Sequence, residues 1–244
     1  AGAAIGTAQL WQGRNSELRW LEYAQGLGSL CLLTASGILM YAFVVSDFSV
    51  DYVANYTDRA LSLFYRCTAF WGGHEGSLLF WALMVSVCGT AFLFTRTYRS
   101  LSLETRNWFL VFFLAIMAFF GLLLSTWSNP FLQTVPAPAD GQGLNPLLQN
   151  PGMIFHPPLL FLGYGGFVIP GCLALAQAMS TQKDPMHWLD VARPFTLTGW
   201  LFLTAGIVLG GWWAYMELGW GGYWAWDPVQ NASLLPWLIG TAAL

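Results

Sequence analysis

Five long runs of the chain contain no charged residue, and this feature limits the fold more than any other. Each run has at least 18 residues without Asp, Glu, Lys or Arg. Because about 20 apolar residues of α-helix cross the ~30 Å hydrocarbon core of a bilayer, each run predicts a transmembrane helix. We therefore expect an all-α fold, a polytopic bundle of transmembrane helices. The five runs are residues 24–45, 77–94, 108–127, 157–179 and 195–216.

Two shorter apolar segments lie at the ends of the sequence. Residues 233–244 cover only about half a membrane thickness, and residues 1–11 resemble the last part of a span. Counting both, we expect about six to seven spans. Since the sequence does not start with Met and its last helix is unfinished, we expect residues 1–244 to be a partial membrane domain of a longer protein.

The composition excludes an ordinary water-soluble domain. Only 9% of the residues are charged, against roughly 25% in soluble domains. With nine Lys and Arg and a net charge of −3, the chain lacks the basic patch that phosphate binding requires, so we expect no nucleic-acid partner. The four Cys form no CxxC motif and no cluster with His, which argues against a zinc site or a disulfide scaffold.

Basic residues are divided unequally between the two sets of connecting loops. Residues 12–23, 95–107 and 180–194 contain seven of the nine Lys and Arg. The opposite loops contain only Arg59 and Arg66, with most of the loop Gly, Pro and aromatic residues. Since Lys and Arg accumulate in cytoplasmic loops, we expect the second set to face the periplasm or its equivalent. A functional site is expected on that face, in residues 46–76, 128–156 and 217–232.

Residues 211–233 form the most unusual segment of the sequence. They read GWWAYMELGWGGYWAWDPVQNAS and carry seven aromatic residues between Trp212 and Trp226. Trp and Tyr favour the membrane–water interface, so the segment can be an interfacial belt. Alternatively, its density of rings suits a large flat apolar ligand with a polar rim.

Asp227 has a structural interpretation of its own. With Pro228 at the first helical position and Gln230 at the third, it gives the pattern of a capping box at the start of a helix. Capping is compatible with ligand contact, because free N–H groups at a helix start favour an anion.

Two His residues of the periplasmic loops are candidate ligands. His156 stands directly before Pro157 and Pro158, which suit the first turn of a helix. Its imidazole can ligate iron, or it can be an amphipathic residue at the interface. His74 and Glu75 lie in a glycine-rich turn, where they form either a ligand or proton-handling pair or a polar helix cap.

Four stretches of the chain resemble, in order, the haem-handling proteins of cytochrome c maturation. They are FVVSDFSVDYVAN, WGGHEGSLLFW, NPLLQNPGMIFHPPLLFLGYGGF and WGGYWAWDPVQNASLLPWL, the last being similar to the WWD segment of that superfamily. Over essentially its whole length the chain looks most like the CcmF-type haem lyases, including their nitrite-reductase-associated relatives.

The resemblance implies that the chain binds haem at the periplasmic face and takes part in its covalent attachment to the CxxCH thiols of apocytochrome c. His156 would be an axial ligand of the iron of a b-type haem that is being delivered. Residues 211–233 would form the haem platform, with direct contacts from Trp220, Tyr223, Trp224, Trp226 and Asp227. Further candidate contacts come from the residues themselves: they are His74, Glu75 and either Arg66 or Arg59, the only two cations of the periplasmic loops, which could meet the haem propionates.

The resemblance also implies partners and a location. The partners would be the haem chaperone CcmE, apocytochrome c, CcmH-like and CcmI-like maturation subunits, and membrane lipid. The location would be the bacterial inner membrane, or an organellar inner membrane, with the WWD loop in the periplasm. In the family a second outward-facing His and a pair of His that hold a separate haem b lie downstream of the matching region. The chain would therefore be an incomplete haem lyase component.

Two other functions remain open. The first is a haem-delivery protein of the same superfamily, which loads a haem chaperone without ligation. The second is a structural subunit of a membrane assembly with an aromatic belt. Haem binding would exclude the structural subunit, and only thioether product separates the lyase from the delivery protein.

Overall fold

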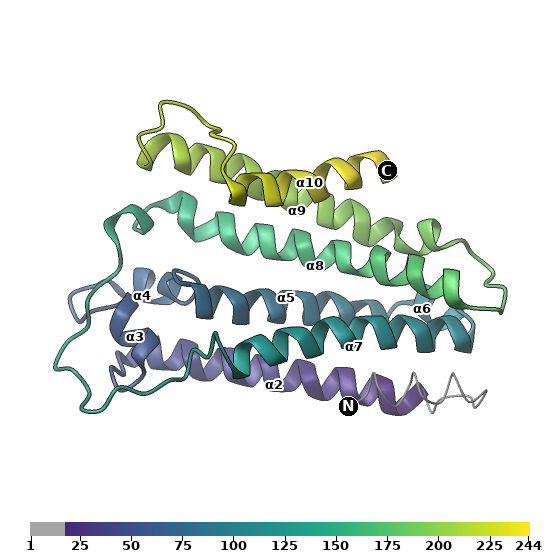
Figure 1. The fold of residues 1–244 in the computed structure, drawn as a ribbon, viewed down its shortest axis with the longest axis horizontal. Helices are drawn as coiled ribbons and strands as arrows, with labels where there is room; N and C mark the ends of the chain where they lie inside the picture. Colours follow the sequence, from purple (N-terminus) through teal and green to yellow (C-terminus); the bar gives the residue numbers. More distant parts are fainter. Residues whose placement is uncertain (1–17) are drawn as a thin grey trace.

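The computed structural model describes residues 18–244 as a bundle of long helices that run side by side along one axis (Figure 1). Five helices are long and apolar enough to cross a membrane, which confirms the predicted all-α membrane bundle. They are α2 (Leu18–Val45), α5 (His74–Leu93), α7 (Leu103–Ser125), α8 (Pro151–Met179) and α9 (Trp188–Glu217). The shorter elements are α3 (Asp51–Tyr56), α4 (Leu63–Ala69), α6 (Arg96–Ser100), the 3-10 turn Pro146–Leu148 and α10 (Pro228–Ala243).

All five long helices begin before the uncharged runs that predict them. Helix α8 begins at Pro151, six residues before the predicted run, because Asn150 caps it and Pro151 occupies its first turn. His156 therefore lies inside the helix rather than directly before it. The run of residues 233–244 belongs to α10, which has 16 residues and starts at Pro228, the first helical position that the capping pattern predicts. The span expected for residues 1–11, like Arg14, lies outside the described residues.

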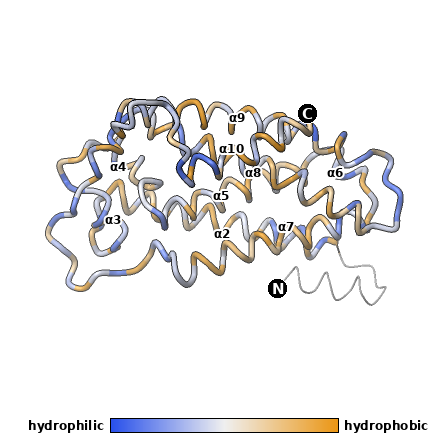
Figure 2. The backbone as a smooth tube through the Cα atoms, turned by 45° about the horizontal axis from the view of Figure 1, so that its top comes forward, coloured by the Kyte–Doolittle hydropathy of each residue, from blue (hydrophilic) through white to orange (hydrophobic). Residues whose placement is uncertain are grey.

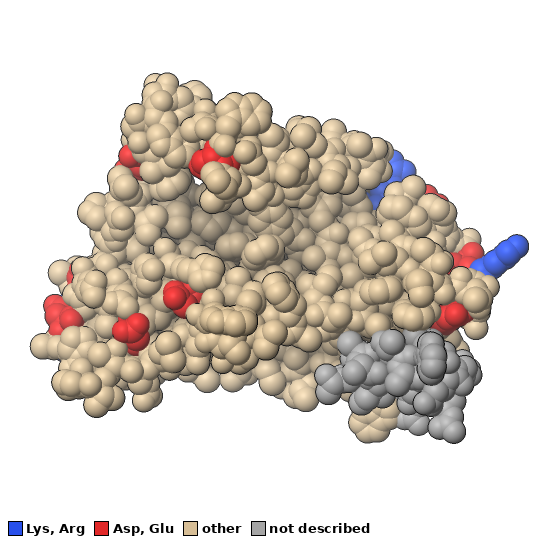
Figure 3. Space-filling model, viewed as in Figure 1, with Lys and Arg blue, Asp and Glu red and all other residues tan. Residues whose placement is uncertain are grey.

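Within residues 18–244, the two predicted sets of loops lie at opposite ends of the bundle (Figure 1). We call the end that carries α3, α4 and residues 126–150 and 218–227 the aromatic end, and the end that carries α6 and residues 180–187 the basic end. Hydrophilic residues gather in the connections while the helices are mainly hydrophobic (Figure 2). In the view of Figure 3, Lys and Arg are visible only at the basic end.

A polar cluster lies between α2 and α5 within the apolar bundle. The side chain of Gln25 is 1% exposed, and its amide donates to the hydroxyls of Ser29 (3.1 Å), Ser86 (3.3 Å) and Thr90 (3.3 Å). Ser29 and Ser86 also bond each other at 2.7 Å. Because hydrogen bonds between helices partly replace the hydrophobic driving force that lipid does not provide, this cluster fastens α2 to α5.

Helices α8 and α9 pack closely because glycines face each other across their contact. A Cβ on Gly166 would lie 2.7 Å from the Cα of Gly199, so a larger residue does not fit there. Small residues allow two backbones to approach in a membrane. This close contact brings the aromatic-end halves of α8 and α9 together, where the candidate site lies.

At the aromatic end, α3 is bound to the turn before α5. The Tyr52 hydroxyl accepts a hydrogen bond from the N–H of Gly73 (2.9 Å) and donates to the carbonyl of Phe70 (3.1 Å). Burial raises the pKa of the Tyr52 phenol, so it stays protonated and can donate. The tyrosine thereby fixes the turn between α4 and α5.

Candidate functional site

A cavity at the aromatic end lies among α8, α9, α10 and the loop of residues 218–227, which we call the Trp-rich loop. Its volume is about 350 Å³, within the range of ~300–1,000 Å³ typical of ligand pockets. Four of the predicted site residues line it: His156, Trp220, Trp224 and Asp227. The other lining residues are Leu160, Ile207, Gly210, Gly211, Trp213, Ala214, Leu218, Val229, Gln230 and Ser233.

His156 lies in the second turn of α8, and α9 fixes the orientation of its ring. Its Nδ1 is 2.6 Å from the carbonyl oxygen of Gly206. A carbonyl oxygen can only accept, so Nδ1 carries the proton and donates, and Nε2 keeps its lone pair. Metal-binding histidines commonly donate their second N–H to a backbone carbonyl in this way. The His156 ring is thus in the tautomer that a metal ligand needs.

Gly210 leaves the space that the His156 ring occupies. A Cβ at this position would lie 2.6 Å from Nδ1 and 3.0 Å from Nε2 of His156. We predict that Gly210→Ala displaces the ring, breaks its bond to Gly206 and lowers the free energy of unfolding by about 1–3 kcal/mol, the usual cost of overpacking. Thermal unfolding in detergent measures this loss.

Gly171→Ala is the matched control for that variant, because nothing lies within 4 Å of the added Cβ in the same helix bundle. We expect it to leave the stability unchanged or to raise it slightly, since Ala favours helix more than Gly does. Equal losses in the two variants would contradict a specific contact with His156.

The Trp-rich loop turns at three residues with positive φ. Gly219 (+64°) and Gly221 (+72°) adopt this conformation readily, whereas Trp226 (+58°) has a Cβ that makes it cost about 1–2 kcal/mol. Trp226 is 68% exposed, and its ring meets that of Trp224 edge-on at 5.9 Å. The strained backbone therefore directs one Trp outward while its neighbour lines the cavity.

Tyr223 and Trp226 are not among the residues that line the cavity. Tyr223 is exposed and stacks on Tyr215, with ring centroids 4.5 Å apart and an angle of 15° between the planes. The predicted platform is thus divided into rings that line the cavity and rings on the outer surface of the loop. Contact of Tyr223 and Trp226 with haem stays a prediction.

Trp224 has a buried polar group that no described residue satisfies. Its Nε1 has no hydrogen-bond partner within residues 18–244. Leaving a buried N–H unpaired costs about 1–3 kcal/mol, so such a group indicates a partner outside the described residues.

Asp227 caps α10, as the sequence predicts. Its Oδ1 accepts hydrogen bonds from the N–H groups of Val229 (2.6 Å) and Gln230 (2.9 Å). The side chain of Gln230 accepts from the N–H of Ala225 (2.9 Å), two residues earlier than the bond of a standard capping box. These three bonds join the end of the Trp-rich loop to the first turn of α10.

The segment before α8 is fastened to the end of α9, a connection that no sequence pattern indicated. The Asn150 side chain accepts from the N–H of Gly152 (2.7 Å) and donates to Glu217 (2.6 Å). The indole of Trp213 donates to the carbonyl of Leu147 at 3.0 Å. The Asn-Pro pair is a recognisable helix start, but its bond to Glu217 depends on tertiary structure.

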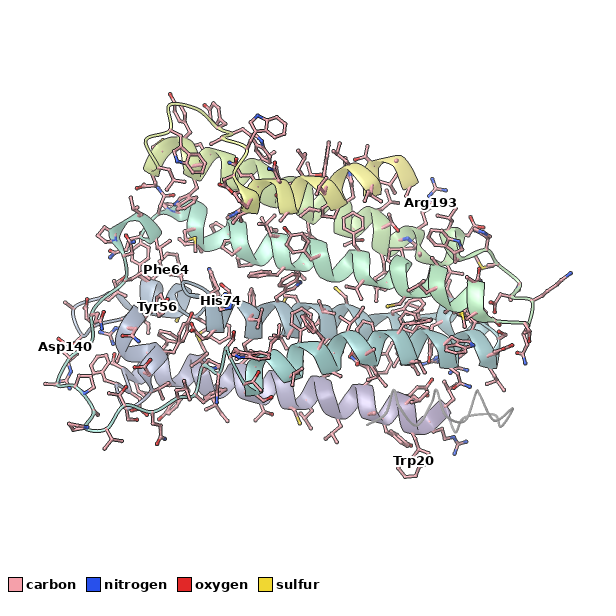
Figure 4. The ribbon with its side chains drawn as sticks, viewed as in Figure 1. Trp20, Tyr56, Phe64, His74, Asp140 and Arg193 are labelled. Atoms are coloured by element: carbon pink, nitrogen blue, oxygen red, sulfur yellow. The ribbon has the colours of Figure 1, made fainter. Side chains whose placement is uncertain are left out.

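His74 and Glu75 lie in the first turn of α5 and do not line the cavity of His156. His74 is exposed (Figure 4), and Glu75 lines a separate polar cavity of about 310 Å³ with Asp51, Tyr52 and Tyr56. Burial, and then the negative charge of Glu75, raise the pKa of the Tyr56 phenol. A carboxylate in the first turn favours a helix start, but the N-cap of α5 is Gly73, so both interpretations of His74 and Glu75 stay predictions.

Arg66 also lies away from the cavity of His156. Its Nε donates to the carbonyl of Leu61 (2.8 Å) and its Nη2 to the carbonyl of Arg59 (2.6 Å). The guanidinium therefore closes the turn that leads into α4. A contact between Arg66 and a haem propionate stays a prediction that these bonds do not favour.

Comparison with known proteins gives consistent matches. The model of the cytochrome c assembly protein family matches residues 71–244. The chain is 48% identical over 213 residues to the probable cytochrome c-type biogenesis protein NrfE of Escherichia coli K12, covering 87% of this chain and 38% of the relative. It is 46% identical over 237 residues to CcmF of Pseudomonas fluorescens, covering 97% of this chain and 34% of the relative.

The solved structure of a protein named Cytochrome c Heme Lyase CcmF matches the fold with a TM-score of 0.78 and 32% identity, covering 99% of this chain and 38% of that one. The chain thus spans little more than a third of the length of these proteins. The resemblance drawn from the sequence motifs is confirmed. The chain belongs to the cytochrome c assembly protein family, as a relative of CcmF and NrfE.

Proposed function

We propose that this chain forms a haem-binding face of a cytochrome c maturation protein and, as part of a haem lyase, takes part in attaching haem to apocytochrome c. The observation that carries the proposal is the cavity shared by His156, Trp220 and Trp224, in which Nδ1 of His156 donates to Gly206 and Nε2 is left for a metal. The likeness of the fold to that of CcmF, which is named a haem lyase, supports it.

Three properties of the cavity suit haem, which is a flat aromatic ring system with a central iron and a polar edge. Its walls carry the indole rings of Trp213, Trp220 and Trp224. His156 offers an imidazole nitrogen of the kind that ligates haem iron. The Nε1 of Trp224, which has no partner within residues 18–244, would donate to an acceptor on the ligand. Tyr223 and Trp226 would extend the aromatic surface outside the cavity.

The chemistry of attachment fits a site without a nucleophile of its own. A Cys thiol of apocytochrome c adds across a vinyl group of haem: the C–S bond forms at one carbon and the hydrogen goes to the other. The protein has to bind and orient the two reactants. His156 would bind the iron, and Asp227, by capping α10, would keep the Trp-rich loop in place.

We assign the type of haem, the partners and the location by analogy with the family. The bound haem would be a b-type haem in transit, and a second haem b would be bound by parts of the protein outside this chain. CcmE would deliver the haem, and CcmH-like and CcmI-like subunits would bring apocytochrome c. The protein would lie in the bacterial inner membrane with the Trp-rich loop in the periplasm, because the basic residues gather at the opposite end of the bundle.

A chimaera tests the proposed function. This chain replaces the matching part of Pseudomonas fluorescens CcmF, to which it is 46% identical, in bacteria that lack their own CcmF. We expect covalent cytochrome c, measured by haem staining of denaturing gels, and we expect its loss when the chimaera carries His156→Ala. The amount of chimaera in the membrane is measured in parallel, so that misfolding is recognised.

Each outcome of this experiment selects one function. Covalent product that depends on His156 supports a haem lyase component. Haem in the purified chimaera without any covalent product favours the haem-delivery protein. A folded chimaera without haem contradicts the proposal. It supports the alternative in which the Trp-rich loop is an aromatic belt of a structural subunit.

A further inference from the structure

The turn of α8 that carries His156 contains a backbone carbonyl without its normal donor. In an α-helix the carbonyl of Met153 would accept from the N–H of residue 157, but that residue is Pro157 and has no N–H. The indole Nε1 of Trp71 donates to this carbonyl instead, at 3.2 Å. Trp71 thus replaces a helical hydrogen bond three residues before His156.

Trp71 is itself held in place in the turn between α4 and α5. Its ring stacks on that of Phe80, with centroids 5.3 Å apart and an angle of 24° between the planes. Its carbonyl accepts from the hydroxyl of Ser77 at 2.8 Å. Because its backbone and its ring are both fixed, its N–H is a rigid donor toward α8.

The His156 turn is therefore fastened on two sides. On one side Trp71 binds the carbonyl of Met153, and on the other the carbonyl of Gly206 in α9 accepts from Nδ1 of His156. If the bond between Trp71 and Met153 were lost, this turn of α8 could move. The bond between His156 and Gly206 would then lengthen. Orientation of a metal-binding His by such indirect partners is a general requirement of metal sites.

We propose that Trp71 is a positioning residue for His156, which acts through the Met153 carbonyl that Pro157 leaves free. The inference rests on the proposed function in one respect, that His156 ligates haem iron. Trp71 lies outside the cavity and is not among its lining residues, so its effect on the ligand is transmitted through α8.

The test uses Trp71→Phe, which keeps an aromatic ring to stack on Phe80 but removes the N–H. Trp81→Phe is the matched control, because Trp81 lies in α5 at the end of the same sequence motif, stacks on Phe161 (5.9 Å, 23°), and its Nε1 has no partner within residues 18–244. Pro157→Ala supplies the third variant, since it restores a backbone N–H that can bond Met153 within the helix.

Two measurements are made on the purified chain in detergent. The first is the tautomer of His156 in the haem-free protein, from the ¹⁵N resonances of ¹⁵N-histidine-labelled chain, assigned with His156→Gln. The second is the titration with haemin, followed by the position of the Soret band. We expect a single Nδ1–H tautomer in the original chain and in Trp81→Phe, and a mixture of tautomers in Trp71→Phe.

We expect Trp71→Phe to lower the affinity for haemin roughly tenfold. This is the lower end of the loss that follows when a partner that orients a metal ligand is removed. In a chain that also carries Pro157→Ala, Trp71→Phe should lower the haemin affinity less than about twofold. Both substitutions act on the carbonyl of Met153, which the new N–H at residue 157 can bond in place of Trp71. This compensation distinguishes positioning from a general loss of packing.

Three results would overturn the inference: an unchanged tautomer in Trp71→Phe, an equal change in Trp81→Phe, or the same loss with and without Pro157→Ala. Failure of the proposed function would look different. The original chain would then bind no haemin, while the tautomer measurement on the haem-free protein would still decide whether Trp71 positions His156.

Discussion

His156→Ala is expected to remove most of the haem from the purified chain. Losing a partner that merely orients a metal-bound His costs 10–100-fold in affinity, so we expect more than about 100-fold for loss of the ligand itself. The imidazole that the structure places in the cavity has Nδ1 bound to Gly206 and Nε2 left for iron, and alanine supplies neither. Absorption spectra of the oxidised and reduced protein, compared at the Soret band, measure the change.

His187→Asn is the control for this experiment. His187 lies at the basic end and caps α9 by accepting from the N–H of Leu189 at 3.3 Å, a bond that Asn can replace. We expect its haem content and spectrum to equal those of the original chain. An unchanged Soret band in His156→Ala would remove His156 from the ligands and with it the proposed site.

Gly76→Ala is expected to destabilise the fold severely. An added Cβ would overlap the carbonyl oxygen of Phe70 and lie 2.5 Å from the hydroxyl of Tyr52. A backbone carbonyl cannot move aside as a flexible side chain can, so we expect a loss of about 3 kcal/mol, the upper end of overpacking costs. The melting temperature in detergent should fall by roughly 10 °C.

Gly26→Ala and Gly28→Ala serve as controls for this prediction. Both lie in α2 with nothing within 4 Å of the added Cβ, and we expect their melting temperatures to stay within a few degrees of the original. A Gly76→Ala protein that melts like these controls would show that the turn between α4 and α5 is free to shift. The tight contact with Tyr52 would then be of no consequence for stability.

The fold could be predicted from the sequence because the bilayer imposes a simple rule. An uncharged run of at least 18 residues favours a membrane span, and each of the five runs lies within a long helix except for one or two residues at the end of two of them. The capping pattern predicted the start of α10 at Pro228, whereas the start of α8 was not predicted. Hydropathy places the start of the fourth span at Pro157, whereas capping by Asn150 moves it to Pro151, outside the apolar run.

The candidate site was predicted in composition but not in arrangement. Residue types and motifs indicated His156 and the Trp-rich segment, and the structure brings four of these residues into one cavity. That Tyr223 and Trp226 lie outside it could not be read from a loop, which has no regular period to tell inside from outside. The bonds of His156 to Gly206 and of Trp71 to Met153 depend on how α5, α8 and α9 are aligned, which no local pattern encodes.

The hydrogen bond between His156 and Gly206 has a consequence for the order in which a growing chain acquires its site. The two residues are 50 positions apart, and at about 5–20 residues per second the ribosome needs roughly 3–10 seconds to travel between them. Asp227 and the start of α10 follow later still. Until Gly206 has been made, the imidazole of His156 lacks the partner that orients it, so a newly made chain can bind haem in the proposed way only after α9 lies beside α8.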